Sequence, residues 1–208
     1  IVLAALAGLL YTLAFPTYNL WPAIWIFALP LLLAVDTAPP LEAFLYGVIA
    51  GLVAWGGTIY WAAYVMHIYG YLSLAVSALI LLLFMTYLAL FFGIFASVAA
   101  RFLHTRHAFL TLPGLWILLE LIRSYALTGF PWALLGYSQF PLKPLIQVAE
   151  VGGVYLISGV IMMANLALYQ CLRKDSKPMI VTVVVVALGL AWGQWRIQTF
   201  EMNGRPLR

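Results

Sequence analysis

Long apolar runs, separated by short polar, glycine-rich or proline-rich interruptions, make up most of this chain. Seven such runs cover residues 1–14, 22–35, 42–66, 71–100, 108–125, 146–171 and 178–195. An α-helix rises about 1.5 Å per residue, so about 20 apolar residues cross the roughly 30 Å hydrocarbon core of a bilayer. The pattern therefore predicts an all-α, polytopic membrane protein with about seven transmembrane helices.

Two of the runs differ in length from an ordinary spanning helix. The first is short, and because the chain begins at Ile1 without a methionine, we expect a spanning helix that is cut short at its start. No small-residue cleavage site of a signal peptide follows it. Run 71–100 carries no charge. As one helix it would extend about 45 Å, so we expect it to tilt or to project beyond the lipid.

Paired glycines within the apolar runs predict close contacts between helices, because a residue without a side chain lets two backbones approach. The pairs are Gly47 with Gly51, Gly56 with Gly57, Gly152 with Gly153, and Gly189 with Gly193.

The amino-acid composition agrees with the membrane assignment and indicates which kinds of partner to expect. Hydrophobic residues make up 66% of the chain and charged residues 8%, against roughly 25% charged in an average soluble domain. The net charge is +4, but the basic residues stand between apolar runs and form no patch interleaved with aromatic residues. We therefore expect membrane lipid, and no nucleic acid, among the partners.

The basic residues predict the orientation in the membrane. Segments 101–107 and 173–177 are basic, and two helices separate them, so they must lie on one side. By the positive-inside rule this side is cytoplasmic, and segment 126–145 faces outward. The aromatic residues of segment 60–71 then form an interfacial belt on the outer side.

Two charges inside an apolar run are the first candidate site. Glu120 and Arg123 are three residues apart and share one helix face. At the bilayer centre each would cost about 2.5 to 3.5 kcal/mol, so the pair needs a reason. Either the two charges neutralise each other, or they brace a loop that lines a lipid-facing cavity. Glu150, near the outer start of the next run, gathers on the same side.

The loop that follows this pair is the second candidate. It is rich in proline, glycine and aromatic residues, among them Phe130, Pro131, Trp132 and Tyr137. Non-helical backbone at membrane depth is tolerated only where protein or a water-filled cavity satisfies it. The loop is therefore predicted to surround the mouth of a cavity, with a packing role as the alternative.

Other reactive side chains carry weaker signals. Cys171 is the single cysteine, so no internal disulfide forms, and no base accompanies it at its helix end. An inert thiol, with palmitoylation as the alternative, is the expectation. His104 and His107 lie in a basic segment with no acidic or thiol partner, so neither a metal site nor a cofactor is predicted.

The run PGLWILLELIRSYALTGFPWALLGYSQ, residues 113–139, strongly resembles the membrane domain of bacterial apolipoprotein N-acyltransferases. Its most specific part is LTGFPWALLGYSQ, preceded by Glu120 and Arg123. Supporting matches are LAFPTYNLWP at 13–22, GTIYWAAYV at 57–65 and AEVGGVYLISGVIMMANLAL at 149–168.

The resemblance implies a multi-pass enzyme of the bacterial inner membrane. Such an enzyme moves an acyl chain from a phospholipid donor to the amino group of the lipid-modified cysteine that begins a diacylated apolipoprotein. It also implies a Glu/Lys/Cys triad in an extracytoplasmic nitrilase-like domain after the seventh helix. No catalytic residue can be placed in this chain. We expect residues 1–196 to be the membrane domain and 197–208 to start the connection to that absent domain.

Within this resemblance, Trp132, Tyr137 and Gln139 are predicted to line a lipid-access cavity, and Glu120 and Arg123 to hold the base of the loop. The alternative function is that of a non-catalytic lipid-binding or scaffolding membrane protein. A small transporter is disfavoured, because we find no internal repeat and no charge near the midplane.

Overall fold

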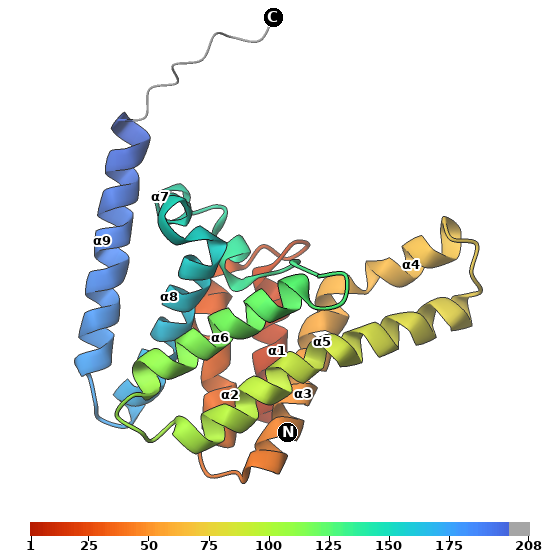
Figure 1. Ribbon diagram of the computed structural model, residues 1–208, viewed down its shortest axis with the longest axis horizontal. Coiled ribbons are helices and arrows are strands. Elements are labelled where there is room, and N and C mark those ends of the chain that lie inside the picture. The colour runs from red at the N-terminus through yellow and green to blue at the C-terminus, as the bar shows by residue number, and fades with distance from the viewer. Residues whose placement is uncertain (200–208) are drawn as a thin grey trace, which may run out of the picture.

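The computed structural model describes residues 1–199, and all the regular secondary structure in this range is helical. The elements follow the predicted apolar runs (Figure 1). In chain order they are α1 (Val2–Ala14), η1 (Trp21–Trp25), α2 (Ala28–Val35), α3 (Pro40–Ile59), α4 (Trp61–Ile68), α5 (Leu74–Phe102), α6 (Ala108–Tyr125), η2 (Leu135–Gln139), α7 (Lys143–Ile146), α8 (Ala149–Leu172) and α9 (Lys177–Thr199).

Five of these helices are long and apolar enough to cross a membrane: α3, α5, α6, α8 and α9. Two shorter apolar helices, Val2–Ala14 and Trp21–Val35, precede them. The prediction of an all-helical membrane protein is confirmed. Of the seven predicted spans, five have spanning length among the described residues, and the first two apolar runs form the shorter helices.

The third apolar run is divided. We predicted one segment over 42–66, whereas α3 ends at Ile59 and α4 begins at Trp61. Apart from Thr58, the positions from 56 to 65 are glycine, apolar or aromatic, so hydrophobic periodicity gives little signal where the chain changes direction. None of the residues of α4 is buried. Together with the first part of α5, α4 forms an arm that projects from the bundle (Figure 1).

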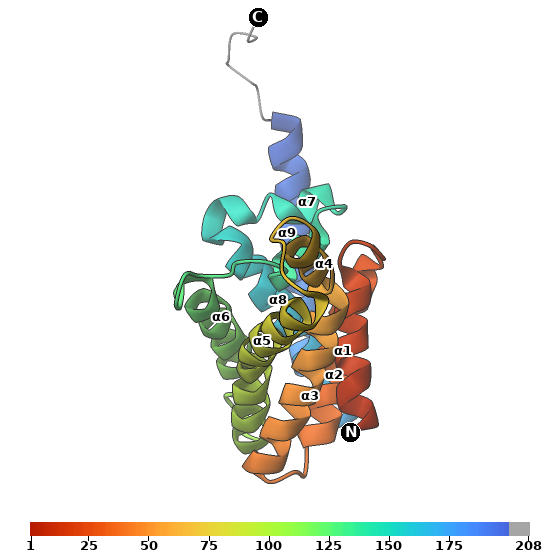
Figure 2. The ribbon, with the colours of Figure 1, turned by 90° about the vertical axis from the view of Figure 1, so that its right-hand side faces the viewer.

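Helices α3 and α5 form the most extensive helix contact among the described residues, and two of the predicted glycines lie in it. A Cβ atom on Gly47 would lie 2.3 Å from the carbonyl oxygen of Phe92, and one on Gly51 would lie 2.7 Å from the Cα atom of Ala89. Figure 2 shows α5 between α3 and α6. Near the other end of the chain, a Cβ atom on Gly193 would lie 1.8 Å from the carbonyl oxygen of Pro144, so α9 also touches backbone directly.

Gly152 and Gly153 kink a helix and do not form the predicted contact between helices. They interrupt the helical dihedral angles of α8, and Gly153 has a φ of 66°. Positive φ is readily adopted by glycine because it lacks a Cβ atom. The pair therefore makes a kink in α8, and only the part after it continues into the bundle.

The connections α5–α6 and α8–α9 lie at one end of the bundle, and the segment between α6 and α8 lies at the opposite end (Figure 1). This arrangement agrees with the predicted common side of segments 101–107 and 173–177. Helix α9 continues to Thr199, past the predicted boundary at residue 196. The rest of the predicted connection, residues 200–208, lies outside the described residues.

Candidate functional site: an aromatic cavity above a buried Glu/Arg brace

Arg123 fastens the start of the loop after α6. Its side chain is buried in the last turn of the helix. Nη1 donates hydrogen bonds to the carbonyl oxygens of Phe130, at 2.7 Å, and Trp132, at 2.9 Å. Its guanidinium carbon also lies 4.8 Å from the ring centroid of Trp55. A guanidinium fits this task because its several N–H donors diverge in a fixed plane.

Glu120 fastens the later part of the same loop. It is also buried, and its Oε1 atom accepts hydrogen bonds from Trp116 Nε1, at 3.0 Å, and from the backbone N–H of Leu135, at 2.8 Å. No ion pair joins Glu120 and Arg123 among the described residues. Each charge is instead directed at the loop backbone, which supports the bracing interpretation over mutual neutralisation.

Two further side chains attach the loop from other helices. Tyr11, buried in α1, donates a hydrogen bond to the carbonyl oxygen of Ala133. Ser158 of α8 accepts one from the N–H of Gly136, at 3.0 Å. Backbone groups of an irregular segment thus find partners within the protein, as burial in a low-dielectric environment requires.

The aromatic side chains of the loop divide between the interior and the surface. Phe130 packs inward, with its ring centroid 4.9 Å from Phe84 and 6.0 Å from Trp55. Trp132 stacks on the outer side of Phe130 at 6.0 Å and remains 54% exposed. Its other neighbour is Trp61 of α4, at 5.6 Å.

Trp132 and Tyr137 face a cavity of about 290 Å³. Its walls come from segments far apart in the sequence and are almost entirely apolar or aromatic, with one hydroxyl-bearing residue besides Tyr137. They are formed by Phe15, Pro16, Thr58, Trp61, Trp132, Ala133, Tyr137 and Phe140. The cavity lies where the α1–η1 connection, the junction of α3 with α4, and the loop after α6 meet.

The structure separates three predicted residues from this cavity. Gln139 does not line it: the short helix η2 turns Gln139 inward, where it is fully buried. There Gln139 accepts a hydrogen bond from Trp25 Nε1 at 3.0 Å and donates one to Ser138 at 2.9 Å. Phe130 belongs to the packing beneath the cavity, and Pro131 is exposed beside it.

Several cavity residues escaped the prediction, notably Phe15 and Trp61. Both lie within the sequence pieces that carried the resemblance, 13–22 and 57–65. The resemblance of these two pieces was the one indication in the sequence that Phe15 and Trp61 could belong to the site. Nothing in the local sequence says that they meet the loop in space.

Glu150, predicted as a support, ties two helices together and does not touch the loop. It accepts two hydrogen bonds from Arg196, from Nε at 2.8 Å and from Nη2 at 2.9 Å. The bonds join the start of α8 to the end of α9.

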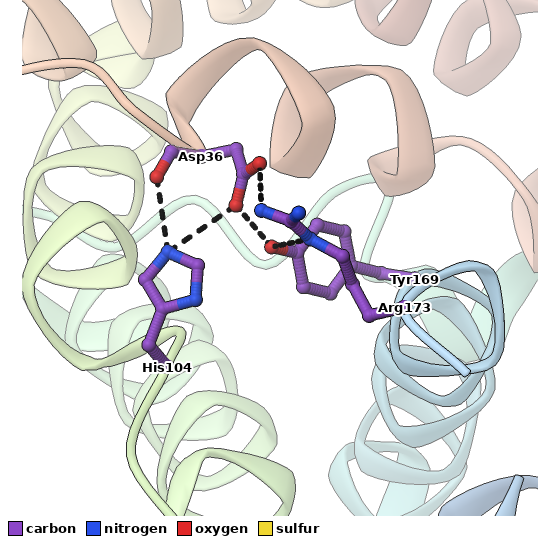
Figure 3. A network of polar contacts seen from close by, with 4 residues as sticks. All are labelled: Asp36, His104, Tyr169 and Arg173. Carbon is purple, nitrogen blue, oxygen red and sulfur yellow. Dashed lines mark hydrogen bonds and ion pairs between the residues drawn. The ribbon is translucent and has the colours of Figure 1, made fainter. Parts of the chain in front are cut away.

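At the opposite end of the bundle, Asp36 gathers a polar cluster (Figure 3). It accepts hydrogen bonds from Arg173 and Tyr169, and His104 Nε2 lies 3.3 Å from its Oδ1 atom. The expectation that His104 lacks an acidic partner is therefore wrong, because Asp36 comes from a distant part of the sequence. Burial alone would raise the pKa of Asp36, but the hydrogen bonds from Arg173 and Tyr169 outweigh it and lower the pKa below its usual value.

The fold defines the class of this protein: a polytopic α-helical membrane protein whose longest irregular segment is fixed by buried charges. The family model described as the apolipoprotein N-acyltransferase N-terminal domain matches residues 7–167. The chain belongs to this family.

Curated relatives named apolipoprotein N-acyltransferase agree with this assignment. The protein of Geobacter metallireducens is 36% identical over 217 residues, which cover 100% of this chain and 42% of the relative. The proteins of Pseudomonas syringae pv. tomato and Vibrio parahaemolyticus are 33% and 31% identical, over 92% of this chain and 38% and 39% of their own lengths. The chain thus spans about two fifths of the relatives it matches.

Proposed function

We propose that this chain is the membrane domain of an apolipoprotein N-acyltransferase, and that it contributes membrane anchoring and a lipid-access cavity. The full-length enzyme would move an acyl chain from a phospholipid to the amino group of the lipid-modified cysteine that begins a lipoprotein. The observation that carries this proposal is the aromatic cavity of about 290 Å³ at Trp132 and Tyr137, above the buried brace of Glu120 and Arg123.

The physical problem of the reaction explains why a membrane domain needs such a cavity. Burial of one methylene is worth about 0.8 kcal/mol, so bringing a sixteen-carbon chain into water would cost on the order of 10 kcal/mol. Both substrates are held in the membrane by their acyl chains, so the active site of the full-length enzyme must lie at the membrane. Apolar walls let acyl chains approach the reacting groups without crossing water.

The reacting groups themselves are proposed to lie outside this chain. Among the described residues, the walls of the cavity include no thiol, carboxylate or imidazole. Cys171 is exposed at the far end of α8. The Glu/Lys/Cys triad implied by the family resemblance would act above the cavity, where its thiolate attacks the phospholipid ester, releases the lysophospholipid and holds the acyl group as a thioester. The amine of the lipoprotein then takes the acyl group and frees the thiol.

The orientation is part of the proposal. Segments 101–107 and 173–177 are basic and share the end of the bundle opposite the loop (Figure 1), which supports a cytoplasmic position for them in the bacterial inner membrane. The cavity then opens on the extracytoplasmic side, where lipoproteins receive their acyl chains in this family.

The substitution Trp132→Ala in the full-length enzyme tests the cavity. Removal of this half-buried ring should raise the KM for the phospholipid about fivefold to tenfold, equivalent to roughly 1 to 1.4 kcal/mol of lost apolar contact, with a smaller change in kcat. The measurement is the initial rate of acyl transfer at varied phospholipid concentration in mixed micelles.

Trp195→Ala is the matched control, because Trp195 is 57% exposed, close to the 54% of Trp132, but lies on α9 away from the cavity. It should leave the kinetics unchanged. Kinetics of Trp132→Ala equal to those of the wild type would remove the cavity from the mechanism. Mass spectrometry of lipoprotein N-termini, in cells that lack the full gene, tests the acyltransferase assignment itself.

A further inference from the structure

A second pocket lies at the end of the bundle opposite the aromatic cavity. It has a volume of about 420 Å³ and lies between the α5–α6 connection and the α8–α9 connection. Both connections join helices of membrane-spanning length, so the pocket sits where four such helices end. This is the depth at which phospholipid headgroups meet a membrane protein.

The polar lining of this pocket carries both signs of charge. The positive groups are the guanidinium groups of Arg106 and Arg173, and the carboxylate of Asp175 is the negative one. Arg173 already donates to Asp36, which does not line the pocket. Arg106 donates through Nε to His107 at 2.9 Å and forms no ion pair with a carboxylate among the described residues. Its two terminal nitrogens can still donate to an anion.

The lining also includes four uncharged or weakly basic polar side chains, His104, Thr105, Tyr169 and Gln170, and three apolar ones. Leu103, Phe109 and Pro178 stand at the helix ends beside the charged groups. Apolar side chains next to charged ones can contact the start of an acyl chain while the charged groups bind the headgroup. A soluble anion has no apolar part that could make such contacts. The chemistry of the walls therefore favours a lipid over a free phosphate.

We propose that this pocket binds the headgroup of a phospholipid of the adjacent leaflet, and that this headgroup carries both a phosphate and a primary ammonium. The phosphate accepts hydrogen bonds from Arg106, and the ammonium donates to Asp175. Asp36 already pairs with Arg173, which leaves the guanidinium of Arg106 and the carboxylate of Asp175 as the two charges of the lining that form no ion pair among the described residues, so a zwitterionic phosphoethanolamine headgroup matches them better than an anionic one. This site is separate from the aromatic cavity, and the inference does not depend on the proposed acyl transfer.

Native mass spectrometry of the full-length protein tests this site. The protein is released from micelles that contain equal amounts of phosphatidylethanolamine, phosphatidylglycerol and phosphatidylcholine with the same acyl chains. The wild type should retain phosphatidylethanolamine in preference to the other two. Arg106→Ala should lower this retention about tenfold, equivalent to roughly 1.4 kcal/mol for a charge-assisted contact.

Arg101→Ala is the matched control, because Arg101 is an exposed arginine of the same basic segment that does not line the pocket. It should change retention little. Equal losses in the two variants would show that only the general positive charge attracts lipid, and would overturn the site. Gel filtration of each variant checks its folding.

Asp175→Asn gives an independent test should Arg106→Ala fail to fold. Loss of the carboxylate should weaken retention of phosphatidylethanolamine and strengthen that of phosphatidylglycerol, so their ratio falls. An unchanged ratio would overturn the ammonium contact. Soluble phosphoethanolamine should fail to displace the lipid at equal concentration. If it displaces the lipid fully, the pocket is a site for a small ion and not for a membrane lipid.

Discussion

The two ends of this bundle are stabilised by different kinds of polar contact. At the end with the aromatic cavity, the buried side chains of Glu120 and Arg123 reach the backbone of a long loop from inside. At the other end, Arg173 and Asp36 join neighbouring connections side chain to side chain, with 51% and 16% of these side chains exposed. Attachment from inside fixes the path of a backbone and leaves the rings of Trp132 and Tyr137 about half exposed. Attachment from outside holds two helix ends together.

The comparison predicts a large effect for Arg123→Met. The substitution keeps the apolar stem but removes the donors to the carbonyl oxygens of Phe130 and Trp132, and it leaves Glu120 as a buried charge without a nearby cation. The stability of the protein should fall by about 3 to 5 kcal/mol. Thermal denaturation of the full-length protein in detergent, followed by gel filtration, measures this change.

Arg123→Lys is the informative partner of this variant. An ammonium keeps the charge but lacks the planar fork of a guanidinium, so it should recover only part of the loss. If Arg123→Met were as stable as the wild type, the loop would not need the hydrogen bonds of Arg123. This result would contradict the comparison between the two ends of the bundle.

A smaller effect is expected for Asp36→Asn at the opposite end. The partner side chains of Arg173 and His104 are 51% and 58% exposed, so solvent screens their contacts with Asp36, and the loss should be about 1 kcal/mol or less near neutral pH. Because the folded protein lowers the pKa of Asp36, the stability that its charge contributes is present above the unfolded pKa of about 3.9 and is lost as the pH falls through the folded value.

Denaturation curves recorded from pH 7 down to pH 3 check this prediction. The wild type should approach Asp36→Asn in stability at the acid end of the range. A difference between the two proteins that stays constant over the whole range would contradict a role for the carboxylate charge.

The smallest effect should come from Glu150→Gln. Its partner Arg196 and Glu150 itself are both at the surface, with side-chain exposures of 30% and 52%. Exposed pairs contribute little to stability and are screened by salt, so the melting temperature should stay close to that of the wild type. A clear fall in melting temperature that persists in high salt would show that this pair belongs with the interior attachments.

The sequence was most informative where polar residues interrupt its apolar runs. Two charges in an apolar run, followed by a proline-rich and aromatic loop, predicted that Glu120 and Arg123 hold that loop, and the observed hydrogen bonds support this. The helices themselves followed from the apolar runs, because a bilayer demands long uninterrupted stretches.

What the sequence could not predict depends on contacts between distant positions. Tyr11 bonds Ala133, and Asp36 bonds Arg173, across more than a hundred residues. The inward direction of Gln139 depends on η2, whose partner Trp25 lies in another part of the chain. The break after Ile59 lies among mostly apolar and aromatic residues, where periodicity does not distinguish one face of a helix from another.

The kink at Gly152 and Gly153 gives α8 two tasks that a straight rod could not combine. Above the bend, Glu150 meets Arg196 on α9; below it, Ser158 reaches sideways to Gly136 of the loop. Helix α8 thereby links the end of α9 to η2, the short helix that carries Tyr137 of the cavity wall.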